Sequence, residues 1–144
     1  MFKHILIPTD GSGLSVEAVK RGVDFARETG ARITFMTVTI PFPHSPLSEF
    51  AGQTHAIYDT EMKKTAGERL GMAEEIAKAA GVPCDTRSYH NWQPYNAILQ
   101  AAEEAKCDAI FMASHGRRGI AGMLLGSEAQ KVLTHGKLPV IVYR

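Results

Sequence analysis

Short apolar segments alternate with amphipathic ones along this sequence, and this alternation is the strongest constraint on its fold. Segments rich in apolar and β-branched residues predict five strands, at residues 4–9, 32–39, 82–89, 108–114 and 139–143. Strands that alternate with helices favour parallel pairing through right-handed crossovers. We therefore expect an α/β fold, a doubly wound, Rossmann-like, five-stranded parallel sheet with helices on both faces.

The intervening segments carry apolar residues at the three- and four-residue spacing of helices. The first helix follows Ser12 or Ser15 as a cap and stops at Gly30, and the second runs from about Gln53 to Ala80. Two more helices are expected at about 94–102, with Pro94 in the first turn, and at 127–134. Three prolines make residues 40–52 a surface loop. The strand at 82–89 is polar enough to lie near a sheet edge.

Composition narrows the classes of function. The 144 residues, 44% of them apolar, are enough for one domain with a core of its own. Sixteen basic and fifteen acidic residues leave a net charge of +1, which argues against nucleic acid and anionic membranes as partners. Neither a signal peptide nor a membrane-spanning run is evident. Cys84 and Cys107 form neither a Cys-x-x-Cys pair nor part of a dense disulfide framework. We therefore interpret them as reduced thiols and expect a cytoplasmic protein.

A glycine-rich segment follows the fourth strand and leads into the last helix. Backbone N–H groups and a helix dipole that converge in this way form an anion site, with the Ser127 hydroxyl at the helix start. The alternative is a glycine-rich turn that only reverses the chain, with Arg117 and Arg118 solvated. The candidate phosphate-binding residues are Ala113, Ser114, His115, Gly116, Arg117, Arg118, Gly119, Gly126, Ser127 and Glu128.

The expected sheet also predicts where a ligand binds. In open α/β sheets ligands bind outside the carboxyl ends of strands, where the strand order reverses. This rule points to the ends of the first and fourth strands, at Asp10 and Ser114. A carboxylate facing phosphates is repulsive, so Asp10 either binds them through Mg²⁺, or faces the uncharged part of the ligand, or serves as a turn or capping residue.

These motifs resemble those of the universal stress protein family over essentially the whole chain. Its nucleotide-binding members carry Gly, two residues, Gly, nine residues, then Gly and Ser or Thr. Here Gly116, Gly126 and Ser127 match, whereas Ala113 replaces the first glycine and adds one methyl group. Further matches are residues 8–12 after the first strand, Thr37 and Val38 at the end of the second, and residues 138–142.

The resemblance implies one universal stress protein domain over residues 1–144, with the adenine nucleotide alpha hydrolase-like variant of the fold. It also implies ATP as ligand and a role in stress survival. The family pattern puts Pro8 beside the base and the backbone around Val38 at the adenine edge. Thr9 and Thr37 are either part of this site or ordinary strand residues.

The carboxyl-terminal strand is apolar and would invite pairing if it forms a sheet edge. The family's members are usually homodimers, and pairing with the twofold copy would cover this edge. The alternative is a helix or loop that covers it. The strand concerned runs from Leu138 to Tyr143.

No catalytic residue is identifiable. His115 lies in the phosphate loop without a nucleophile at a recognisable spacing, and the histidines lack the spacing of a zinc site. Trp92 is interpreted as a packing anchor rather than a stacking platform. The leading hypothesis is an ATP-binding homodimer whose nucleotide is a regulatory or slowly hydrolysed ligand. The alternative is a nucleotide-free sensor or interaction module of the same fold, which Ala113 favours, and an ATP-using ligase or hydrolase ranks last.

Overall fold

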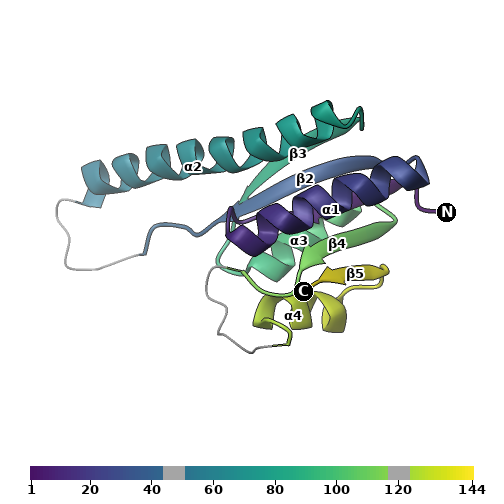
Figure 1. Cartoon of the computed structure of the whole chain (residues 1–144). Coiled ribbons are helices and arrows are strands. Elements are labelled where there is room, and N and C mark those ends of the chain that lie inside the picture. Colours follow the sequence, from purple (N-terminus) through teal and green to yellow (C-terminus); the bar gives the residue numbers. More distant parts are fainter. Residues whose placement is uncertain (44–50, 117–123) are drawn as a thin grey trace.

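Five parallel strands form the sheet in the computed structural model, which describes residues 1–43, 51–116 and 124–144, and of residues 51–53 the backbone only. The order across the sheet is β3-β2-β1-β4-β5 (Figure 1). This confirms the predicted doubly wound sheet. In chain order the elements are β1 (His4–Pro8), α1 (Gly13–Thr29), β2 (Arg32–Thr39), α2 (Ala51–Ala79), β3 (Cys84–His90), α3 (Pro94–Glu104), β4 (Ala109–Ala113), α4 (Ser127–His135) and β5 (Val140–Tyr143).

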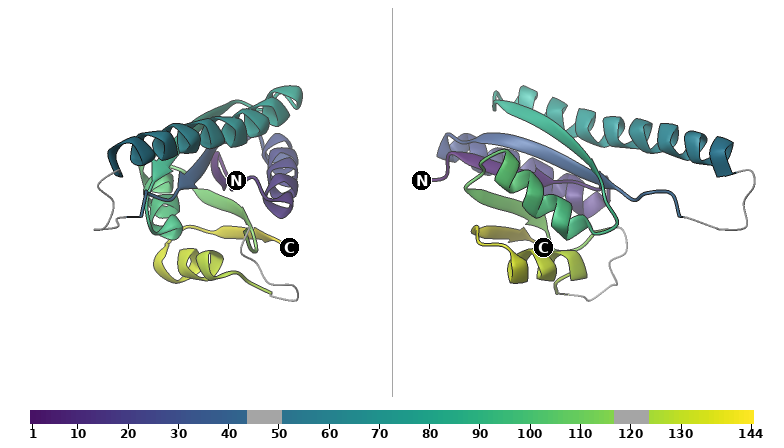
Figure 2. Two further views of the ribbon diagram at one scale, coloured as in Figure 1. Left: turned by 90° about the vertical axis from the view of Figure 1, so that its left-hand side faces the viewer. Right: turned by 180° about the vertical axis from the view of Figure 1, so that it is seen from behind.

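The strands bury both faces, because alternate residues point into two separate cores. Ile5 and Ile7 of β1 pack with buried residues of α1 and α2, whereas Leu6 packs with buried residues of α3 and α4. In β4, Phe111 packs into the core with α1 and α2, whereas Met112 packs into the core with α3 and α4. The helices therefore cover opposite faces, α1 and α2 on one side and α3 and α4 on the other (Figures 1 and 2).

Helix α1 has the caps that the sequence predicts. The Ser12 side chain accepts a hydrogen bond from the amide of Ser15 at 3.3 Å, so Ser12 is the cap and Ser15 lies inside the helix. Gly30 ends the helix in the left-handed conformation, with φ of 73°.

Helix α2 begins at Ala51, two residues before its predicted start, and runs through the glycines at 67 and 71 without interruption. Its first turns project past the carboxyl ends of the strands (Figures 1 and 2). Residues 44–50 of the predicted loop lie outside the described part of the chain. In residues 1–43, 51–116 and 124–144, no helix combines the length and apolar character that a bilayer crossing needs.

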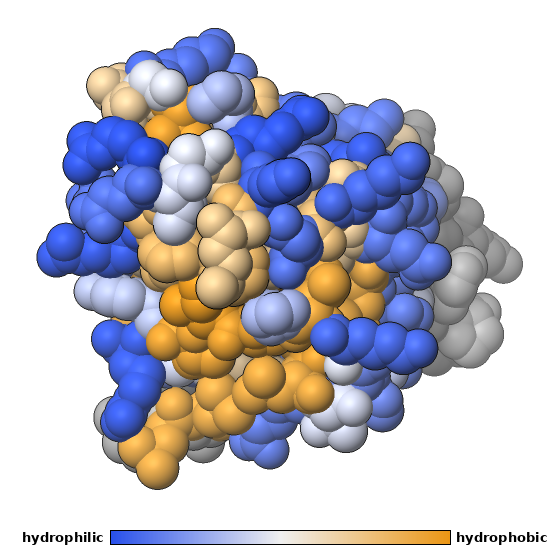
Figure 3. Space-filling model, turned by 90° about the vertical axis from the view of Figure 1, so that its right-hand side faces the viewer, coloured by the Kyte–Doolittle hydropathy of each residue, from blue (hydrophilic) through white to orange (hydrophobic). Residues whose placement is uncertain are grey.

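Strands β3 and β5 form the two edges of the sheet, so the predicted edge position of β3 is confirmed. Strand β5 starts at Val140, one residue later than predicted, and its four residues are all half-buried. Figure 3 shows a continuous apolar area in the lower half of this face of the molecule, at the height of β5 in Figure 1. Ile141 and Tyr143 pack only at the margin of the core beneath α1.

Both cysteines are free thiols, as their spacing predicts. Cys107 is buried next to β1 and β4, and burial raises the pKa of its thiol to about 11. Cys84 is half-buried, and burial also raises the pKa of its thiol. Both groups are therefore protonated and weakly reactive near neutral pH.

Gly22 sets how closely α1 approaches the sheet. A Cβ atom at this position would lie 2.5 Å from Cδ1 of Ile7 and 3.2 Å from the ring of Phe111. We expect Gly22→Ala to destabilise the fold by about 1–2 kcal/mol, because overpacking outweighs the better helix propensity of alanine. Thermal unfolding followed by circular dichroism measures the change.

Gly67→Ala is the matched control, since Gly67 lies in α2 with no neighbouring atom within 4 Å of the new Cβ. Here alanine should stabilise the fold by up to about 1 kcal/mol. A rise in Tm of similar size for both variants would contradict the close contact between α1 and β1.

Candidate functional site

A cleft of about 480 Å³ opens at the carboxyl ends of β1, β2 and β4, beside the first turns of α3 and α4. We call it the strand-end cleft. Its volume lies within the range of small-molecule sites. Of the residues predicted for the site, ten line it: Pro8, Thr9, Asp10, Val38, Ala113, His115, Gly116, Gly126, Ser127 and Glu128.

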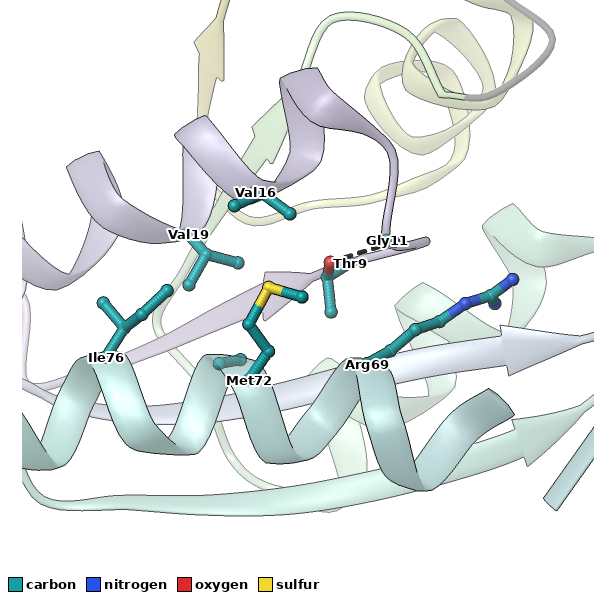
Figure 4. Close-up of a pocket in the computed structure, with 8 residues that line it drawn as sticks. Thr9, Gly11, Val16, Val19, Arg69, Met72 and Ile76 are labelled. Carbon is teal, nitrogen blue, oxygen red and sulfur yellow. Dashed lines mark hydrogen bonds between the residues drawn. The ribbon is translucent and has the colours of Figure 1, made fainter. Parts of the chain in front are cut away.

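The cleft lies where the strand order predicts it. Strand β1 leads into α1 on one face of the sheet, whereas its neighbour β4 leads into α4 on the other. The two connecting segments therefore diverge and leave space between them. A second hollow between α1 and α2, with a volume of about 10 Å³, is large enough for only about one water molecule (Figure 4).

One end of the strand-end cleft is apolar. Val38 lies near the end of β2 and Ile40 directly follows this strand, whereas Trp92 lies between β3 and α3 and Pro94 is the first residue of α3. Trp92 is 56% exposed, so its interpretation as a packing anchor is wrong. The side chain stands at the cleft instead of filling the core.

The turn after β1 is held by its own side chains. Asp10 accepts a hydrogen bond from the amide of Ser12 at 2.9 Å through Oδ1. Thr9 Oγ1 accepts one from the amide of Gly11 at 3.3 Å and lies 3.1 Å from the Ser15 hydroxyl. Gly11 has a φ of 75°, which a side chain would disfavour. The turn role considered for Asp10 is therefore confirmed, and Oδ1 is the atom that performs it.

The glycines of the loop are needed for close packing. A Cβ atom at Gly116 would collide with Oδ2 of Asp10, which brings the loop after β4 against the turn after β1. A Cβ atom at Gly126 would lie 2.9 Å from the carbonyl oxygen of Ser114. Both glycines thus allow the two connections to approach each other at the cleft.

The amides of the loop are only partly available to a ligand. The amide of Gly126 donates to the Ser114 carbonyl at 2.5 Å, and the amide of Ser114 donates to the Tyr143 carbonyl at 2.7 Å. These two amides are therefore bonded within the fold, and the prediction that backbone N–H groups of this segment bind an anion is wrong for them. Ser127 is exposed at the first position of α4 and lines the cleft.

Glu128 joins the two helices that border the cleft. Its Oε2 atom accepts a hydrogen bond from the amide of Tyr95 at 2.7 Å, in the first turn of α3, and its other oxygen lies 3.5 Å from Nζ of Lys131. Gln93, at the N-cap position of α3, makes no side-chain capping bond. The Glu128 carboxylate satisfies an amide of the first turn instead and so acts as a capping group for α3.

Two predicted residues do not line the cleft. Thr37 is 1% exposed, and its hydroxyl accepts a hydrogen bond from Arg69 at 3.3 Å. Ser114 is 2% exposed, and its hydroxyl lies 3.2 Å from Nδ1 of His115. Because Ser114 is buried, this pair does not expose a nucleophile to the cleft. Arg117, Arg118 and Gly119 lie outside the described residues.

Nine residues that line the cleft were not predicted, because their positions depend on the tertiary fold and not on a local motif. Arg69 is the most consequential, since it brings a guanidinium group from α2 to the cleft. Nothing in the local sequence distinguishes it from other charged helix residues. The nine are Ser15, Met36, Ile40, Arg69, Trp92, Pro94, Ile98, Met112 and Ala129.

The cleft has charges of both signs. Asp10 and Glu128 supply carboxylates, Arg69 supplies a guanidinium group and His115 supplies an imidazole. Within residues 1–43, 54–116 and 124–144, no three metal-binding side chains gather into a cluster. A divalent cation here would need ligands from a bound molecule, as Mg²⁺ commonly takes from phosphates.

The Glu128 cap generates a prediction. Glu128→Ala should lower the free energy of unfolding by about 1 kcal/mol, since the amide of Tyr95 loses its acceptor. Glu128→Gln should retain most of this free energy, because the side-chain amide oxygen still accepts the hydrogen bond from the Tyr95 amide. Urea unfolding measures both variants. Lys131→Ala is the control for the exposed ion pair and should cost less than about 1 kcal/mol. Equal losses for Glu128→Ala and Lys131→Ala would contradict the capping role.

Comparison with known proteins agrees with this architecture. The model of the universal stress protein family matches residues 1–144. A universal stress protein of Methanocaldococcus jannaschii, MJ0531, is 32% identical over 144 residues, covering 100% of this chain and 83% of the relative.

Solved structures share the fold. Universal stress protein UspA from Lactobacillus plantarum superposes with a TM-score of 0.85 at 19% identity, covering 99% of this chain and 97% of that one. A universal stress protein in complex with cAMP is 28% identical, with a TM-score of 0.70 and coverage of 99% and 97%. With its sheet order, its strand-end cleft and the match along residues 1–144, this chain belongs to the universal stress protein family.

Proposed function

We propose that the strand-end cleft binds an adenine nucleotide, ATP in the first place, as a regulatory or slowly hydrolysed ligand in a stress response. The observation that carries this proposal is the meeting of apolar strand ends with a glycine loop and the start of α4 in one cleft of about 480 Å³. The similar structure with bound cAMP supports an adenine nucleotide as the class of ligand.

The free energy of micromolar binding requires contacts of the nucleotide at both ends of the cleft. A helix start contributes about 0.3–2 kcal/mol toward a bound anion, whereas micromolar affinity needs about 8 kcal/mol. Apolar contacts to the base supply the difference, at roughly 25 cal/mol per Å² of apolar area buried. In the proposal, Val38 and Pro8 contact the base, and Gly116 and Ser127 lie at the phosphates.

Two charged side chains set the electrostatic environment of the phosphates. Asp10 Oδ2 lies against Gly116, so an unshielded triphosphate there would meet a carboxylate at short range. We propose that Mg²⁺ bridges Asp10 and the phosphates, which fits the preference of this ion for one or two carboxylates plus phosphate oxygens. Arg69 then balances the remaining negative charge from the α2 side of the cleft.

The chemistry of the site supports binding better than fast catalysis. His115 is paired with the buried Ser114 hydroxyl, and Glu128 caps α3 through the Tyr95 amide. Each of these acid–base groups thus has a structural bond. The alternative is a nucleotide-free sensor or interaction module, and the internal bond of the Gly126 amide is the observation that favours it. The free thiols are consistent with the proposed cytoplasmic location.

We propose in addition that the protein is a homodimer that pairs through β5. Among the described strands, β5 pairs with β4 alone, so its outer edge offers unpaired backbone groups. Its four side chains are half-buried. An antiparallel pairing with the twofold copy would cover both.

Nucleotide binding is tested with dialysed protein by titration calorimetry, with and without Mg²⁺. We expect saturable micromolar binding of ATP that Mg²⁺ strengthens. Asp10→Asn keeps an oxygen for the Ser12 amide but removes the charge. This variant should bind Mg²⁺-free ATP roughly tenfold more tightly than the unmodified protein, because repulsion is removed, and should gain little from Mg²⁺.

The control is Asp24→Asn, which removes a carboxylate from the exposed side of α1, where Asp24 pairs with Arg27. Its ATP affinity should equal that of the unmodified protein. No binding of ATP at millimolar concentration would support the nucleotide-free alternative. Unchanged Mg²⁺ dependence in Asp10→Asn would refute the bridging role alone.

The dimer predicts a mass of two chains by light scattering at micromolar concentration. Ile141→Lys places a charge on the apolar edge strand and should shift the mass toward one chain. Ile57→Lys is the control, since Ile57 is 65% exposed on α2, far along the chain from β5. A one-chain mass for the unmodified protein, or a dimer that both variants retain, would argue against pairing through β5.

A further inference from the structure

We infer that Trp92 stacks on the base of the bound nucleotide and gives the strand-end cleft its preference for a purine. This inference rests on the proposed nucleotide binding and assigns the base a specific partner. It makes Trp92 a specificity-determining residue of the site.

The exposure of Trp92 singles it out. Six large apolar side chains in the described part of the chain are exposed, and Trp92 is the one of them that lines the strand-end cleft. Trp92 is also the single tryptophan of the sequence. An indole left in water loses the free energy that its burial would supply, so a ligand that covers it gains that contribution.

The backbone around Trp92 is fixed on both sides. The amide of Asn91 donates to the Thr39 carbonyl at 3.0 Å, and the amide of Gln93 donates to the Asn91 side chain at 2.9 Å. Pro94 then starts α3 with its restricted φ. The indole is therefore presented from a preformed segment, which lowers the entropic cost of ordering it around a ligand.

The position of Trp92 matches the base and not the phosphates. It follows β3, which pairs with β2 in the sheet, and it lines the cleft together with Val38 and Ile40 at the end of β2. The glycine loop follows β4, which lies on the far side of β1. A nucleotide whose phosphates reach Gly116 and Ser127 would extend its base across β1 toward Val38 and Trp92.

Stacking on an indole explains a preference without base-specific hydrogen bonds. A purine offers two fused rings to an aromatic side chain and a pyrimidine offers one, so the contact area differs. Alanine substitution of a stacking residue typically costs a factor of roughly 5 to 150 in affinity. We expect ATP and GTP to lose most in such a variant, CTP less and inorganic tripolyphosphate nothing.

The test combines fluorescence and calorimetry on the full chain. In the unmodified protein, ATP should change Trp92 fluorescence along the same saturation curve that calorimetry gives, whereas tripolyphosphate should leave the emission unchanged. Trp92→Ala should weaken ATP binding by roughly 5- to 150-fold. The ATP affinity of Trp92→Phe should lie between those of the unmodified protein and Trp92→Ala. Ile57→Ala, at an exposed apolar site on α2 outside the cleft, should bind ATP normally.

The outcomes separate the two proposals. If the unmodified protein and Trp92→Ala bind ATP equally and the fluorescence does not change, the stacking role is refuted while nucleotide binding stands. If the unmodified protein binds no nucleotide, both proposals fail. Equal losses for ATP and tripolyphosphate in Trp92→Ala would also refute stacking. Circular dichroism shows whether the variants fold, and the fluorescence test on the unmodified protein needs no variant.

Discussion

Burial of the strands on both faces is the constraint from which the rest of the structure follows. Ile5 and Ile7 need a helical layer on one side of the sheet, and Leu6 needs another on the opposite side. The chain satisfies both by sending α1 and α2 to one face and α3 and α4 to the other. Where adjacent strands β1 and β4 feed opposite layers, their connections diverge. The strand-end cleft is thus a result of core packing, and its chemistry comes from the residues that line the opening.

The opening depends on small residues as much as on charged ones. Gly116 lets the loop after β4 lie against Asp10, and Gly126 lets the chain return past the Ser114 carbonyl into α4. Side chains at these two positions would meet a carboxylate or the main chain. The same glycines that define the family motif therefore have a packing role before any ligand is present. The apolar end of the cleft is therefore as important to the proposal as the glycine loop.

The periodicity of the sequence predicted the fold, since two-sided strands and capped helices are encoded in neighbouring residues. The sheet class, the edge position of β3 and the helix stop at Gly30 are borne out by the structure, and Ser12 is the cap of the two serines considered. Of the site, the sequence located the residues after β1 and β4, because the topological rule depends only on strand order. It did not locate Arg69 or Trp92, whose positions depend on how α2 and the β3–α3 segment pack. The bonds of Glu128 and of the Gly126 amide likewise join residues that only the tertiary fold brings together.

A crystal structure of the chain with a non-hydrolysable ATP analogue and Mg²⁺ is the decisive test of nucleotide binding in the strand-end cleft. We expect the adenine between the end of β2 and Trp92, with the phosphates at the start of α4 beside Gly116. A base bound elsewhere, or phosphates held away from the glycine loop, would contradict this expectation.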